Sequence, residues 1–198
     1  MKIRLTAVLL AGVGLLSLLA MMPAHARLTK KSKLYLDGLG PIQAGMTVAE
    51  AERAIGQQLM NPDLSGERLD MRCYYLPAPN TPPNGSASLN FMVYPAGDRI
   101  DRYRDRIVRV GIDRGSSITT LSGAAIGSTE AEIMAMYPGR IKVTRHHYTG
   151  DQGGKYLTYV PRAAANKKYS LVFETLNGKV TSFRSGLADA VSRIEGCS

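Results

Sequence analysis

The side chains best suited to chemistry gather in one short segment, DRIDRYRDRIVRV, residues 98–110. A guanidinium group binds a carboxylate or phosphate through paired hydrogen bonds, so clustered arginines indicate an anion-binding surface. Three aspartates lie among the arginines and neutralise part of their charge. The sequence therefore leaves two interpretations open, a surface that attracts an anionic partner or a solvated hairpin held by ion pairs, and the aspartates favour the second. The candidate binding residues are Arg99, Arg102, Tyr103, Arg104 and Arg106, with Arg109 following them.

A second candidate is the pair His146–His147, with Tyr148 beside it, in the segment RHHYTGDQGG, residues 145–154. Adjacent residues on a strand point to opposite faces, so the two imidazoles would not chelate one ion together. Zinc needs further ligands at a workable spacing, and the closest carboxylate is Asp151, in a glycine-rich loop. We therefore expect no metal site, and an ordinary loop or edge pair is the simpler interpretation of these candidate binding residues.

The motifs of common catalytic sites do not fit this chain. The segment GDQGGKY, residues 150–156, lacks the upstream glycine spacing of a phosphate loop, and Tyr156 stands where Ser or Thr would hold magnesium. No G-x-S-x-G elbow is present. A thiol nucleophile would need a free cysteine near a histidine. We expect a protein that is not an enzyme, with no catalytic residues and no cofactor; a hydrolase remains the alternative.

The N-terminus has the pattern of a secretory signal peptide over residues 1–26. Lys2 and Arg4 form a basic region, residues 5–20 form an apolar region, and Ala24–Ala26 match an A-x-A cleavage site. An uncleaved membrane anchor is the alternative. We expect cleavage near Ala26 and a periplasmic or secreted protein, since no later run is long and apolar enough to span a membrane.

Cys73 and Cys197 are the two cysteines of the chain. An even pair in an exported protein predicts a disulfide, and a loop of this length would add roughly 4–5 kcal/mol of stability in the loop-entropy model. The alternatives are two free thiols or, more remotely, a metal site.

The charge balance favours anionic partners. Without Lys2 and Arg4, 23 basic and 16 acidic residues leave a net charge of +7. For an exported chain such partners are acidic proteins, cell-wall polymers or lipid headgroups, whereas nucleic acid is not expected. The same charge is also explained by solubility alone.

The chain reads as two copies of one unit, 82 positions apart. This offset places GMTVAEAERAIG, residues 45–56, on the segment that begins at Gly127, and it aligns Ile55 with Tyr137. The same offset matches three further pairs, Tyr74 with Tyr156, Leu89 with Leu171 and Phe91 with Phe173. Agreement of separate blocks in one register indicates a tandem duplication.

Each copy predicts a short helix followed by antiparallel strands. Thr47 with Glu50, and Thr129 with Glu132, form capping boxes at the two helix starts. The glycines at 45 and 127 stand where the chain must turn. Strands are predicted at 72–76, 88–94, 106–112, 140–144, 155–160, 169–176 and 179–184, the last two joined by the hairpin signal Asn177–Gly178. The fold class is α+β, with an N-terminal segment 27–44, repeat 1 at 45–115 and repeat 2 at 116–198.

The duplicated G-x-T-x-x-E helix start, followed by strands, resembles the β-lactamase-inhibitor-protein-like architecture. A single such unit is similar to the small outer-membrane lipoprotein of the β-barrel assembly machinery (the SmpA/BamE family). The ending LVFETLNGKVTSFRSG with EGCS is similar to exported bacterial proteins of the same layout, to which no activity is attached. The resemblance implies two modules whose sheets join into a concave, protein-binding surface without catalysis. No lipid-anchor cysteine follows the cleavage site, so a membrane-tethered role is not implied.

We therefore expect an exported binding or inhibitor-type module that contacts another envelope protein. The alternative is a module that binds anionic envelope polymers through the basic hairpin. The loops at 95–105 and 145–154, where the copies differ, are the segments expected to carry individual function.

Overall fold

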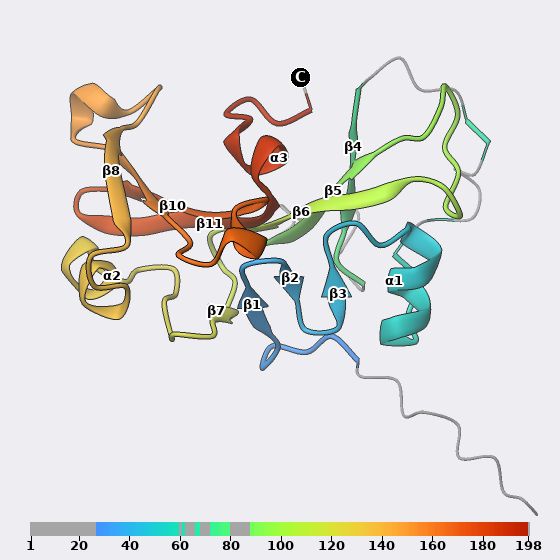
Figure 1. The fold of residues 1–198 in the computed structure, drawn as a ribbon, viewed down its shortest axis with the longest axis horizontal. Coiled ribbons are helices and arrows are strands. Elements are labelled where there is room, and N and C mark those ends of the chain that lie inside the picture. The colour runs from blue at the N-terminus through green and yellow to red at the C-terminus, as the bar shows by residue number, and fades with distance from the viewer. Residues whose placement is uncertain (1–26, 60, 62–65, 68–71, 80–87, 198) are drawn as a thin grey trace, which may run out of the picture.

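The computed structural model describes residues 27–59, 61, 66–67, 72–79 and 88–197. The predicted signal peptide, residues 1–26, lies outside the described residues. The protein is α+β, with short helices and two sheets (Figure 1). The larger sheet has seven antiparallel strands in the order β4-β5-β6-β11-β10-β9-β8. Their bounds are β4 (Tyr74–Pro77), β5 (Leu89–Tyr94), β6 (Arg106–Ile112), β8 (Ile141–Arg145), β9 (Lys155–Tyr159), β10 (Tyr169–Leu176) and β11 (Lys179–Leu187).

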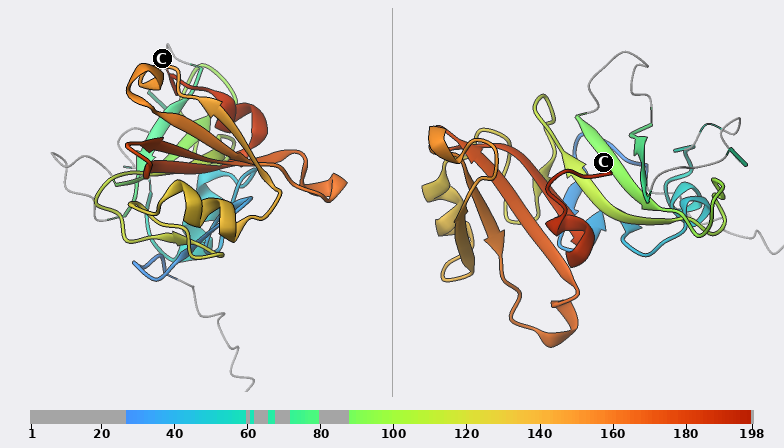
Figure 2. Two further views of the ribbon diagram at one scale, coloured as in Figure 1. Left: turned by 90° about the vertical axis from the view of Figure 1, so that its left-hand side faces the viewer. Right: turned by 90° about the horizontal axis from the view of Figure 1, so that it is seen from above.

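Each of these strands overlaps one that the sequence predicts. The Asn177–Gly178 turn joins β10 to β11 with both residues at positive φ, 52° and 73°, as a two-residue hairpin turn requires. The two halves of the sheet meet where β6 pairs with β11, with Val110 opposite Ser185. Figure 2 shows this junction from above, with the strands of the two halves strongly twisted relative to one another.

Helices α1 (Val48–Ile55) and α2 (Glu130–Met136) begin as predicted. At each start the threonine accepts from the backbone N–H of the glutamate three residues on, and that glutamate accepts from the threonine's own N–H. Gly45 and Gly127 precede the caps with φ of 103° and 86°, values that side chains other than glycine rarely adopt. The predicted capping roles of Thr47, Glu50, Thr129 and Glu132 are therefore confirmed.

A second, small sheet was not predicted. Its strands run in the order β3-β2-β1-β7, with β1 pairing in parallel with β7. It draws the N-terminal segment into the core, where Leu34, Leu39 and Ile42 are fully buried. Its strands are β1 (Lys33–Tyr35), β2 (Gly38–Leu39), β3 (Ile42–Gln43) and β7 (Thr119–Thr120).

The large sheet is covered on two faces. Its inner face, toward the small sheet, α1 and α2, carries the main core, which includes Phe91, Phe173 and Phe183. Its outer face carries α3 (Ala188–Ser192) and the chain that follows to Cys197. We call residues 188–197 the C-terminal strap. The predicted disulfide is confirmed: Cys73 and Cys197 are bonded, with their Cα atoms 5.2 Å apart, and the bond fixes the strap beside β4.

Candidate functional site

Three arginines of the arginine-rich segment contact other parts of the protein. Arg102 forms an ion pair with the buried Glu52 of α1. Arg99 Nη1 donates to the Gly66 carbonyl at 2.8 Å, and Arg106 Nη1 donates to that of Gly45 at 2.6 Å. Arg104 and Tyr103 are the candidates left as exposed side chains without such a contact among the described residues, and Tyr103 is 74% exposed. In the structure, most candidate residues of this segment therefore stabilise the fold through intramolecular contacts.

Asp105 is the centre of that segment. It is fully buried and accepts hydrogen bonds from the Tyr74 hydroxyl and from the backbone N–H groups of Ala96 and Asp101, each at 2.8 Å. Burial, and then the hydrogen bond to Asp105, raise the pKa of Tyr74. A carboxylate with three donors is well satisfied, so Asp105 ties the 95–105 loop to β4 and leaves nothing for a ligand.

The histidine pair follows the end of β8 rather than lying on a strand, and it divides between interior and solvent. His146 is buried and stacks on Tyr156, with ring centroids 4.3 Å apart. Its Nδ1 accepts from the N–H groups of Tyr148 and Thr149, which leaves Nε2 to donate to Glu174 at 3.3 Å. Both ring nitrogens are therefore used in the fold. His147 is exposed, with its ring edge-on to Tyr148.

Tyr148 contacts the strap. Its hydroxyl donates to Glu195 at 2.9 Å, and this hydrogen bond, with burial second, raises the pKa of Tyr148. The 145–154 loop includes a short 3-10 turn, Gly150–Gln152, and reaches the strap on the outer face. The candidate residues of this loop thus come together around Glu174 and the strap, while those of the 95–105 loop lie apart from them.

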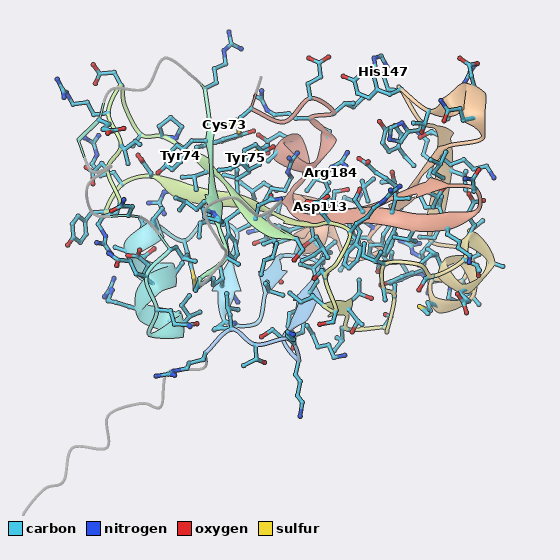
Figure 3. All side chains as sticks on the ribbon, turned by 180° about the vertical axis from the view of Figure 1, so that it is seen from behind. Cys73, Tyr74, Tyr75, Asp113, His147 and Arg184 are labelled. Carbon is cyan, nitrogen blue, oxygen red and sulfur yellow. A yellow bond between two sulfur atoms is a disulfide. The ribbon has the colours of Figure 1, made fainter. Side chains whose placement is uncertain are left out.

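A polar cleft that the sequence analysis did not identify lies on the outer face, where β6 meets β11. Its volume is about 430 Å³. Figure 3 shows Asp113 and Arg184 close to the middle of the sheet and Tyr75, a residue of β4, to one side of them. We call this site the outer cleft; its walls include Tyr75, Asn90, Arg109, Asp113, Glu174, Arg184 and Ile194.

The positions of these side chains follow from strand alternation. Arg109, Gly111 and Asp113 occupy alternate positions along and just beyond β6, so they face one side of the sheet. Gly111 pairs with Asn90 on one side and Arg184 on the other. A Cβ on Gly111 would lie 2.6 Å from Asn90 Oδ1, so glycine leaves the room that the Asn90 amide occupies. This alternation can be read from the sequence, and it could have predicted that Arg109 and Asp113 lie on the same face of the sheet.

The ionisable groups of the outer cleft are held in contrasting states. Burial would raise the pKa of Glu174, but the charge and hydrogen bond of Arg184 outweigh it and lower that pKa. Burial, and then the Glu174 charge, raise the pKa of Asp113, whose amide partner Asn90 donates at 3.1 Å. Burial also lowers the pKa of Arg109. Arg184 and Glu174 form an ion pair, whereas Arg109 and Asp113 have no ion pair among the described residues.

A second cavity, of about 380 Å³, lies on the inner side between the small sheet and the β9–β10 part of the large sheet. We call it the tyrosine groove, because its walls include Tyr35, Tyr137, Tyr159 and Tyr169, with Leu121 and Asn166. Tyr137 donates to the Thr120 hydroxyl at 2.9 Å and packs against Tyr159 with ring centroids 5.4 Å apart. Leu121 is 67% exposed. The groove is a fixed aromatic surface with an apolar side chain open to solvent.

Within the described part of the chain, no cluster of three or more His, Cys, Asp or Glu side chains is placed to hold a metal ion. None of the described helices is both long and apolar enough to cross a bilayer. Comparison of the chain with protein-family models, curated proteins and solved structures finds no match. The geometry of the two cavities is therefore the basis for a functional proposal.

Proposed function

We propose that this protein is an exported, non-enzymatic binding module that recognises another envelope protein through the tyrosine groove. The observation that carries the proposal is the groove itself, a fixed cluster of tyrosines beside the exposed Leu121. Tyrosine offers a large contact area at a low cost in side-chain entropy, and it is enriched where proteins bind proteins.

The groove is also preorganised. The hydrogen bond from Tyr137 to Thr120 and its contact with Tyr159 fix the ring before any partner arrives. A surface ordered in advance loses less conformational entropy on association, so more of the contact energy remains as affinity. Asn166, on the turn Ala164–Asn166, adds a polar side chain at the rim.

We further propose that the chain is built from two helix-and-sheet units, in the β-lactamase-inhibitor-protein-like manner. Support comes from the two capping boxes and from the isolated bridges that join each capping threonine to a strand, Thr47 to Arg106 and Thr129 to Lys179. The strand order agrees with it, since the strands follow reverse chain order outward from the β6–β11 junction on both sides, β6-β5-β4 on one and β11-β10-β9-β8 on the other. Superposition of residues 45–112 on 127–184 tests this proposal.

The two-unit proposal gives the groove a simple origin. Ile55 closes the first helix and is fully buried in the core. Its counterpart at the offset of 82 is Tyr137, which lines the groove. Replacement of a fully buried aliphatic residue by a partly buried tyrosine that lines a cavity is the kind of difference between copies that adds a binding site.

Affinity capture from an envelope extract tests the proposed function. The immobilised protein is compared with Leu121→Asp, which places a charge in the groove, and with Tyr103→Asp, a matched change on the arginine-rich segment. We expect a defined set of captured proteins that survives about 0.5 M salt, since apolar contacts are not screened. We expect the set to disappear with Leu121→Asp and to remain with Tyr103→Asp. The opposite pattern, or capture lost in salt, would support anionic recognition by the basic segment and contradict the groove.

A further inference from the structure

The outer cleft presents one cation and one anion without an ion pair among the described residues, Arg109 on β6 and Asp113 just beyond its end. Arg109 is 7% exposed and gives its Nη donors only to neutral groups, the carbonyls of Ala190 and Arg193 and the Tyr75 hydroxyl. Its Nε is buried without a partner among the described residues. Asp113, at the other end of the cleft, accepts from the neutral Asn90 amide, its one side-chain hydrogen bond within the described part of the chain. Neither side chain therefore has a direct ion-pair partner among the described residues, although each is influenced by the other charges of the cleft.

The charged side chains in the middle of the cleft neutralise each other. Arg184 and Glu174 pair with one another there, and Glu174 also accepts from His146. The arginine and carboxylate side chains of the cleft thus sum to zero, two cations against two anions. A ligand with a single net charge meets attraction at one end and repulsion at the other, whereas a ligand with opposite charges at its two ends is attracted at both.

The spacing sets the size of such a ligand. The Cα atoms of Arg109 and Asp113, four residues apart, are separated by about 13 Å along an extended backbone. An extended dipeptide is about 7 Å long, and a hydrogen bond of about 3 Å at each end makes up the difference. The Asn90 amide lies between the two ends, where its oxygen can accept from a peptide N–H. Ile194 of the strap supplies an apolar wall.

We propose that the outer cleft binds a short zwitterionic peptide, with its ammonium group at Asp113 and its carboxylate at the Tyr75–Arg109 end. The Tyr75 hydroxyl accepts from Arg109 Nη2 at 2.7 Å, so its own hydrogen is available to donate to the carboxylate. This site lies on the face of the sheet opposite the tyrosine groove. Its failure would leave the proposed protein-binding function untouched.

Titration calorimetry with capped and uncapped peptides tests the proposal on the purified protein with its disulfide intact. The probes are Ala-Ala, N-acetyl-Ala-Ala, Ala-Ala-amide and free alanine. We expect Ala-Ala to bind with a dissociation constant between about 10 µM and 1 mM, the range of a ligand this small. We expect each capped peptide, and alanine, which is too short to span the cleft, to bind at least tenfold more weakly. Equal affinity of a capped peptide, or no binding of Ala-Ala up to about 5 mM, overturns the proposal.

Two variants locate the ends of the ligand. Asp113→Asn should weaken Ala-Ala binding at least tenfold and leave that of N-acetyl-Ala-Ala unchanged, while the exposed Asp98→Asn, the matched control, changes neither. Tyr75→Phe should weaken Ala-Ala and leave Ala-Ala-amide unchanged. Thermal unfolding midpoints show whether each variant is folded. An Asp113→Asn protein that is folded and binds Ala-Ala normally places the ligand elsewhere and contradicts the assignment.

Discussion

At the scale of single residues, the structure separates charges that hold the fold from charges that remain available. Arg102 and Asp105 looked like parts of one surface cluster in the sequence, yet each contacts a buried partner. The sequence shows which residue types lie close in the chain, but their partners, Glu52 on α1 and Tyr74 on β4, are distant along it. The spacing of the arginines in the sequence could therefore not show whether their side chains are free to bind a partner or already occupied by contacts within the fold. Asp113 shows the reverse, because no motif marks it and only tertiary structure places it beside Arg184.

The opposite pKa shifts of Asp113 and Glu174 predict opposite pH effects on stability. A raised pKa means that the fold disfavours the ionised form, so Asp113 lowers stability once pH rises through its unfolded value, about 3.9. Asp113→Asn should match the parent protein near pH 3 and be more stable at pH 7. Urea unfolding at the two pH values measures this, and a variant that is less stable at pH 7 would contradict it.

The lowered pKa of Glu174 has the other sign. Its ion pair with Arg184 contributes stability above the unfolded pKa, and this is lost as pH falls through the lower, folded pKa. Glu174→Gln should therefore lose about 2 kcal/mol at pH 7, the value of a charge-assisted hydrogen bond. The difference should shrink as the pH of the urea unfolding experiment is lowered. A constant difference at every pH would show that the effect is not electrostatic.

At the scale of elements, local signals predicted the seven large-sheet strands and the first two helices, and they failed where structure comes from distant contacts. Capping boxes, alternating apolar residues and the Asn-Gly turn each act within a few positions. The small sheet does not, because β1 pairs with β7, over 80 residues along the chain, and its strands are two or three residues long. Segment 27–44 therefore shows no regular alternation of apolar and polar residues, although its Leu34 and Ile42 belong to the core.

The two caps offer a matched pair of element-scale tests. Thr47→Ala and Thr129→Ala each remove the side-chain acceptor of one capping box and should cost about 1 kcal/mol of unfolding free energy. Thr47→Ser and Thr129→Ser keep the acceptor and serve as controls. Chemical denaturation measures the change, and the capping role is wrong at any site where alanine and serine behave alike.

At the scale of the whole molecule, the disulfide and the strap fasten the outer face. The strap is held by Cys73–Cys197, by Arg109 through the Ala190 and Arg193 carbonyls, and by Tyr148 through Glu195. These contacts come from the residue before β4, from β6 and from the loop after β8. The strap thus connects both halves of the large sheet across the junction of β6 with β11.

The double variant Cys73→Ser/Cys197→Ser tests this fastening. With a sequence separation of 124 between the cysteines, the loop-entropy model predicts a loss of roughly 4–5 kcal/mol of unfolding free energy. We expect faster amide exchange in α3 than in β5, since the strap loses its end anchor. Thiol titration of the denatured, unreduced parent protein should find no free thiol. Unchanged stability in the double variant would mean that the strap is held by its other contacts.

The position of the disulfide also determines how the protein would respond to mechanical force. If the chain were pulled from Arg27 and Cys197, tension would pass directly from Cys73 to Cys197 and would bypass everything between them. All seven strands of the large sheet lie in the bypassed part, while α1 and strands β1–β3 lie in the loaded part. The chain would then extend by no more than about 160 Å, the contour of the segment before Cys73. An oxidised molecule would therefore behave as a short tether with a rigid body attached, and a reduced one as a chain several times longer.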